Sequence, residues 1–65
     1  MNLTEIERRD AEEEILSWRF EQLLRVGYER RQARVLSRRL DVDLHHAVDL
    51  VRRGCSHELA LLILL

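Results

Sequence analysis

The side chains best suited to chemistry lie in the C-terminal half of this 65-residue chain: three histidines and one cysteine. All four are competent zinc ligands. Their spacing is unfavourable, because adjacent histidines on a helix point about 100° apart and the chain has no Cys-x-x-Cys or His-x-x-x-His pair. We therefore predict no metal site and no cofactor at these residues, which are His45, His46, Cys55 and His57.

Cys55 and His57 could also be a nucleophile and its general base. Such a pair needs a third orienting group, an oxyanion site and a walled pocket, and a short helical chain has little room for these. We therefore predict no catalytic residue, no small-molecule substrate and no enzymatic activity. A free cysteine also behaves as a small hydrophobic residue, which is the simpler interpretation of Cys55.

Arginine supplies all 11 basic residues, and it is concentrated in the middle of the chain. Residues 15–40 carry a net charge of +5, whereas residues 1–14 carry -4 and residues 41–65 carry -2. A stripe of arginines can contact nucleic-acid phosphates or an acidic protein surface, or it can be a solvated face. The candidates for such contacts are Arg30, Arg31, Arg34, Arg38 and Arg39.

The elements that position these side chains are predicted to be helices. Proline is absent, and the only glycines are Gly27 and Gly54, a composition typical of helices broken at two points. We predict an all-α fold, a small bundle of three to four helices in a single domain of residues 1–65. Residues 1–14 are expected to form a charged helical extension that frays, and residues 15–65 a packed helical core.

The first helix is expected to begin with Thr4 as its N-cap and to run to about Val26, where Gly27 supplies a left-handed C-terminal cap. The second is expected to run from about Glu29 to Leu40. Its apolar spacing predicts that it buries three residues, Ala33, Leu36 and Leu40.

The third helix is expected to be capped by Asp41 or Asp43 and to stop at Gly54. Its buried positions follow the spacing i, i+3, i+4 and i+7, which gives Leu44, Ala47, Val48 and Val51. A last helix, Glu58 to Leu65, follows a cap at Ser56 and is apolar on every side. Such a helix is buried in the fold or in a partner.

A sequence echo relates the two glycines at an offset of 27 residues. The segment that ends Val26-Gly27-Tyr28 and is followed by Ala33 matches the segment that ends Arg53-Gly54-Cys55 and is followed by Ala60. Two copies make only a weak repeat. Any helix that ends in glycine before a helix with a small buried residue has the same pattern.

Size and cysteine content bear on stability and location. A domain of this length has a marginal core, and one cysteine cannot form an intrachain disulfide. The N-terminal residues lack the pattern of a signal peptide, so we expect a cytoplasmic protein. The longest apolar run, Leu59 to Leu65, is far shorter than the roughly 20 residues of a membrane span.

Two segments resemble known motifs. Val35 to Leu50 resembles a helix-turn-helix motif in its apolar spacing, with Ser37 at the position of the usual small residue. The turn has Asp41 where that family prefers glycine, and the would-be recognition helix carries Asp43 and Asp49, which phosphates repel.

Leu23 to Val51 resembles the ubiquitin-associated (UBA-like) three-helix fold. The resemblance is carried by Val26-Gly27-Tyr28 in place of the family's Met-Gly-Phe/Tyr loop, and then by Ala33, Leu36, Asp43, Ala47, Val48 and Val51. It implies a small apolar patch for a protein partner, made of Val26, Tyr28, Leu50 and Val51. More loosely, the chain resembles short helical proteins of actinobacteria, which implies no function.

The leading hypothesis is a small helical protein-protein interaction module or adaptor that self-associates. Besides the patch implied by the UBA-like resemblance, Trp18, Leu64 and Leu65 are its predicted apolar anchors, because large apolar side chains exceed what so small a core can bury. The alternative is a helix-turn-helix-like DNA-binding regulator that uses the arginines. A third possibility is binding of the same arginines to an acidic protein surface.

Overall fold

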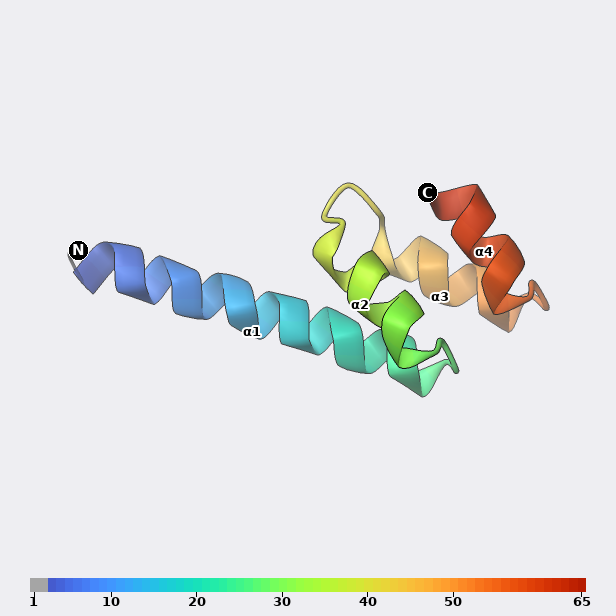
Figure 1. The fold of residues 1–65 in the computed structure, drawn as a ribbon, viewed down its shortest axis with the longest axis horizontal. Coiled ribbons are helices and arrows are strands. Elements are labelled where there is room, and N and C mark those ends of the chain that lie inside the picture. Colours follow the sequence, from blue (N-terminus) through green and yellow to red (C-terminus); the bar gives the residue numbers. More distant parts are fainter. Residues whose placement is uncertain (1–2) are drawn as a thin grey trace.

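The computed structural model describes residues 3–65, and helices joined by short turns make up its regular secondary structure over that range (Figure 1). The prediction of an all-α fold with three to four helices is confirmed, since no strand occurs among these residues. None of the four helices is both long and apolar enough to cross a membrane. The helices are α1 (Leu3–Arg25), α2 (Arg30–Arg38), α3 (Leu44–Arg52) and α4 (His57–Leu64).

The first helix is much longer than the others. It makes the molecule elongated, with extents of 46 × 19 × 18 Å. Its N-terminal half projects away from the other three helices (Figure 1). Residues 4–14, which we call the acidic extension, are exposed throughout, and so is Ile15. The packed part therefore starts at Leu16, one residue later than expected. The expected N-cap at Thr4 is wrong because α1 already includes that residue. Residues 1 and 2 of the predicted extension lie outside the described range.

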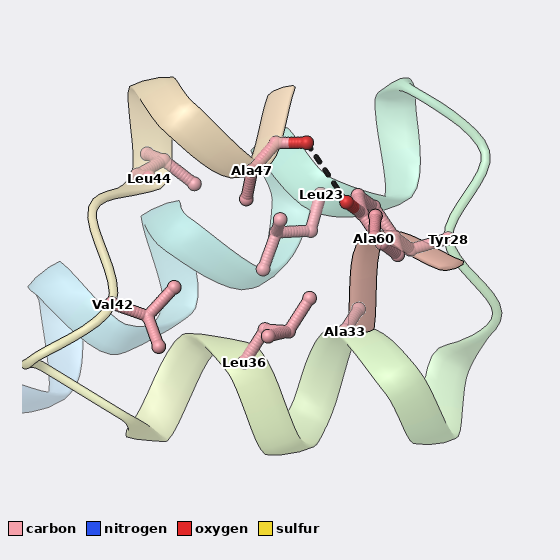
Figure 2. Packing of buried hydrophobic residues seen from close by; sticks show 8 residues of the cluster. All are labelled: Leu23, Tyr28, Ala33, Leu36, Val42, Leu44, Ala47 and Ala60. Carbon is pink, nitrogen blue, oxygen red and sulfur yellow. Dashed lines mark hydrogen bonds between the residues drawn. The ribbon is translucent and has the colours of Figure 1, made fainter. Parts of the chain in front are cut away.

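The core is a single cluster to which all four helices contribute (Figure 2). Its most enclosed large side chains are Leu23 of α1 and Leu36 of α2. Alanines at 33, 47 and 60 have no exposed surface, so the backbones of α2, α3 and α4 can approach closely at these points. The remaining members of the cluster are Tyr28, Val42 and Leu44.

The two glycines form corners of the same construction. Gly27 and Gly54 have φ angles of +95° and +100°. The amide of each glycine donates to the carbonyl three residues earlier, and the following amide donates to the carbonyl five residues before it, with all four distances between 3.0 and 3.2 Å. This pattern is the Schellman motif, which satisfies the last carbonyls of a helix. The sequence echo therefore corresponds to two matching helix-to-helix corners.

Side-chain caps begin the third and fourth helices. The carboxylate of Asp43 accepts hydrogen bonds from the amides of His45 and His46, which identifies Asp43 and not Asp41 as the cap of α3. The hydroxyl of Ser56 accepts from the amide of Leu59 at 3.1 Å, as expected of the cap of the last helix. These bonds satisfy amides that a helix start leaves without an internal partner.

Arg19 determines where α2 ends. From the C-terminal third of α1, its guanidinium donates to the carbonyl oxygens of Leu36, Ser37, Arg39 and Val42 at 2.9 to 3.3 Å. These carbonyls belong to the last turn of α2 and to the following turn, so one side chain satisfies groups that a helix C-terminus leaves open. The prediction that Leu40 is buried in this helix is wrong: the helix ends at Arg38, Leu40 is 67% exposed, and Val42 enters the core instead.

Candidate protein-interaction surfaces

The last helix presents an apolar surface to solvent. Leu59, Leu62 and Ile63 follow the spacing i, i+3 and i+4, so they lie on one side of α4, and we call this side the outer face. All three are exposed, and Leu62, at 79%, is the most exposed large hydrophobic residue among those whose burial the structure describes. Leu65, at the end of the helix, is also exposed. Of the two alternatives predicted for this helix, burial in the fold does not hold for its outer face, and burial in a partner stays a prediction.

The opposite side of α4 is attached to the core. Ala60 is fully buried, and Leu61 and Leu64 pack against the core cluster. Leu64, predicted as a partner anchor, thus faces inward. The sequence indicated that the apolar tail of residues 61–65 holds anchors, but it did not separate the outer face from the buried side. Helical spacing could have found them: once Ala60 and Leu64 are assigned to the buried side, positions 59, 62 and 63 lie on the other.

His57 fixes the start of α4 against the corner that follows α1. Its Nε2 atom lies 2.8 Å from the carbonyl oxygen of Val26. Because a carbonyl oxygen only accepts, Nε2 carries a proton in this contact. The ring also meets the ring of Tyr28 edge-on, with centroids 4.8 Å apart. The imidazole is thus engaged in holding two elements together, and the outer face has a defined orientation on the molecule.

The patch implied by the UBA-like resemblance is mostly turned inward. Tyr28 is 2% exposed, and its hydroxyl donates to the carbonyl of Ala47. Its assignment as a partner-binding side chain is therefore wrong: burial of the ring and a hydrogen bond inside the fold make it part of the core. Val26, Leu50 and Val51 are half-buried and pack against the same cluster, so they offer a partner only part of each side chain.

Trp18 occupies a different surface. It is 52% exposed and lines a shallow groove of about 490 Å³ between α1 and α3. Leu44 and Val48 contribute apolar surface to this groove, and the polar residues of α3 line it as well: His45, His46, Asp49 and Arg52. No residue of α4 lines it. The structure therefore separates two of the predicted anchors, Trp18 and Leu65, into different surfaces.

The arginines of α2 form a charged surface, which we call the arginine face: Arg30, Arg31, Arg34 and Arg38. All four are exposed, and the structure gives none of them an ion pair within residues 3–65. Arg39, predicted with this group, lies beyond the helix and pairs with Asp41 at 2.8 Å. The hydrogen bond from Arg39 holds the pKa of Asp41 at about 2, so this arginine is already engaged.

A second groove runs between the arginine face and α1. Its α2 side carries Arg30, Arg34 and Arg38, and the half-buried apolar side chains on its α1 side are Leu16, Phe20 and Leu24. Glu13 and Glu21 also line the α1 side. The groove therefore joins an apolar surface to a row of three guanidinium groups spaced one helical turn apart.

The residues considered for metal binding and catalysis are dispersed. His45 and His46 are exposed at the start of α3, and Cys55 is a half-buried free thiol in the corner before α4. Within the described range, no three side chains of histidine, cysteine, aspartate or glutamate gather in a geometry that could hold a metal ion. These residues give no basis for a site of that kind in the part of the chain that is described.

Comparisons of the chain with protein families, with curated proteins and with solved structures found no match.

Proposed function

We propose that the chain is a small helical protein-protein interaction module and that the outer face of α4 is its principal binding surface. The observation that carries this proposal is the contiguous exposure of Leu59, Leu62 and Ile63 on a helix whose other side is packed on the core. Soluble domains seldom leave neighbouring large aliphatic side chains exposed without a binding role. The proposed activity is binding, not catalysis.

A protein partner would cover the apolar side chains of the outer face and remove them from water. Apolar area removed from water contributes about 25 cal/mol per Å², and the outer face concentrates that area on one rigid helix. Because α4 is held by His57 and by the burial of Ala60, little ordering is needed when a partner binds. A helix with anchors at i, i+3 and i+4 suits a hydrophobic groove or another helix of matching spacing.

The test is site-specific photo-cross-linking in cells that express the chain. A photoreactive residue at position 63 is expected to give one dominant protein adduct, and the same residue in place of exposed Arg25 is expected to give none. Adding Leu62→Glu to the position-63 variant should abolish the adduct while leaving helicity unchanged, because Leu62 lies outside the core. Equal adducts from both positions, or none from position 63, would refute the proposed surface.

DNA binding is the second candidate, favoured by the arginine face and its lack of ion pairs among the described residues. It is disfavoured by α3, the counterpart of a recognition helix, since Asp43 caps its start and Asp49 is exposed on it. Phosphate binding would appear as a steep fall in affinity for duplex DNA as salt increases. We expect no such binding above the level of an acidic control protein.

A further inference from the structure

We propose that the acidic extension of one copy of this chain docks on the arginine face of a second copy, and that the second copy does the same in return. The contact is separate from the outer face of α4, so it stands or fails independently of the proposed partner surface. It joins an acidic surface and a basic surface of the same molecule.

The two surfaces have opposite and equal charge. The acidic extension holds six acids and two arginines, a net charge of -4. The helix α2 holds four arginines and no acid, a net charge of +4. Within residues 3–65, no arginine of α2 and none of the carboxylates of Glu7, Asp10 and Glu14 makes an ion pair.

The extension also has a suitable face. Glu7, Asp10, Ala11 and Glu14 follow the spacing i, i+3, i+4 and i+7, so three carboxylates surround one small residue on a single side of α1. The central alanine permits close approach of the two helices. Opposite it, Arg30, Arg34 and Arg38 repeat every turn along α2. The 11 residues of the extension span about 16 Å and the nine residues of α2 about 13 Å, so the lengths match.

The pairing must be between molecules. α1 is one continuous helix, and the extension up to Glu12 points away from α2 of its own chain (Figure 1), whereas Glu13 near its end lines the groove beside the arginine face. It cannot fold back without breaking α1. A second copy placed antiparallel brings each extension to the other's arginine face, which is the self-complementary arrangement of a twofold dimer. The groove beside the arginine face offers Phe20 and Leu24 as apolar surface, while Glu13 and Glu21 on its α1 side limit the attraction.

Exposed ion pairs are individually weak and are screened by salt, so the dimer should dissociate as ionic strength rises. The decisive experiment uses two charge-reversed chains of full length. The first carries Glu7→Arg, Asp10→Arg and Glu14→Arg, and the second carries Arg30→Glu, Arg34→Glu and Arg38→Glu. Each alone places like charges in contact, which should raise the dimer dissociation constant by more than about 100-fold.

Mixing the two variants restores opposite charges at both contacts of the twofold pair. Light scattering and analytical ultracentrifugation are therefore expected to show a dimer for the wild type, monomers for each variant alone, and a heterodimer for the equimolar mixture. The matched control is Glu12→Arg against Asp10→Arg, since Glu12 lies on the opposite side of the extension. Asp10→Arg should weaken the dimer and Glu12→Arg should not.

Three results would overturn the inference. One is a wild-type chain that stays monomeric at low salt up to its solubility limit, and another is a mixture that stays monomeric. The third is salt-dependent binding of duplex DNA by the wild type and by the extension variant but not by the arginine variant. The arginine face would then bind phosphates. Circular dichroism of each variant confirms that the substitutions, all at exposed positions, leave the helices intact.

Discussion

The hydroxyl of Tyr28 donates a 2.8 Å hydrogen bond to the backbone carbonyl of Ala47, so the corner that follows α1 is joined to the middle of α3 (Figure 2). Both residues are buried. The ring of Tyr28 also contacts the imidazole of His57 at the start of α4. One side chain thereby connects three helices whose mutual arrangement positions the outer face of α4.

Tyr28→Phe keeps the ring and removes only the hydroxyl. We expect the free energy of unfolding to fall by about 1 kcal/mol, the usual net contribution of one hydrogen bond. Urea denaturation followed by circular dichroism measures this loss, and the slope of the transition should be unchanged because the same surface is buried. A variant as stable as the wild type would mean that the hydroxyl contributes nothing beyond its desolvation.

Alkaline pH should destabilise the wild type more than Tyr28→Phe. Burial, with a smaller contribution from the charge of Cys55, raises the pKa of Tyr28 above its usual value of 10.0. The folded chain therefore favours the neutral phenol, and this stabilisation is complete below the unfolded pKa and lost as pH rises through the folded pKa. Urea denaturation between about pH 8 and pH 11 in a Cys55→Ser background checks the difference. Parallel curves for the two proteins would contradict it.

Arg19→Lys tests how α2 is terminated. Lysine keeps the charge, but its single ammonium cannot reach the four carbonyls that the planar guanidinium contacts. We expect a loss of about 1 to 3 kcal/mol in unfolding free energy, the range for hydrogen bonds that involve a charged group. Arg25→Lys, at an exposed position of the same helix, is the control and should change stability little. Equal effects would show that the carbonyl contacts are not stabilising.

Local patterns predicted the helices, their glycine corners and the caps at Asp43 and Ser56, because each depends on residues within about one turn of each other. Apart from the expected cap at Thr4, the features that were missed depend on residues distant in sequence. Arg19 donates to carbonyls 17 to 23 residues away, at the point where α2 ends and Leu40 is exposed. Tyr28 was assigned to a surface patch by the UBA-like resemblance, and no residue near it in the sequence indicates that its hydroxyl donates to Ala47.

The candidate surfaces were predictable only in part for the same reason. The arginine face follows from helical spacing, but Arg39 is not part of it because α2 ends at Arg38. The apolar character of α4 is plain in the sequence. Its buried side is identified by Ala60, which is fully buried against the core. Helical spacing gives the exposed leucines only once the structure has shown that Ala60 lies on the buried side.

Substitution of the two glycines separates backbone strain from steric contact. Both have positive φ, so alanine is unfavourable at each. A Cβ at Gly27 would also lie 3.0 Å from Nε2 of His57, whereas one at Gly54 meets nothing within 4 Å. We expect thermal denaturation to show a larger loss for Gly27→Ala than for Gly54→Ala. Adding His57→Ala should narrow the difference, and an unchanged difference would assign it to backbone strain alone.

Leu36→Ala and Trp18→Ala distinguish the core from the surface. Leu36 is fully enclosed among residues of the core cluster, so truncation should lower the free energy of unfolding by about 2 to 5 kcal/mol. Trp18 is half-exposed in the α1–α3 groove, and its truncation should cost about 1 kcal/mol because much of its surface already contacts water. Chemical denaturation of the two variants at equal protein concentration makes the comparison. Similar losses would mean that the indole packs into the monomer as tightly as a core leucine, and the groove would then be part of the fold and not a surface open to a partner.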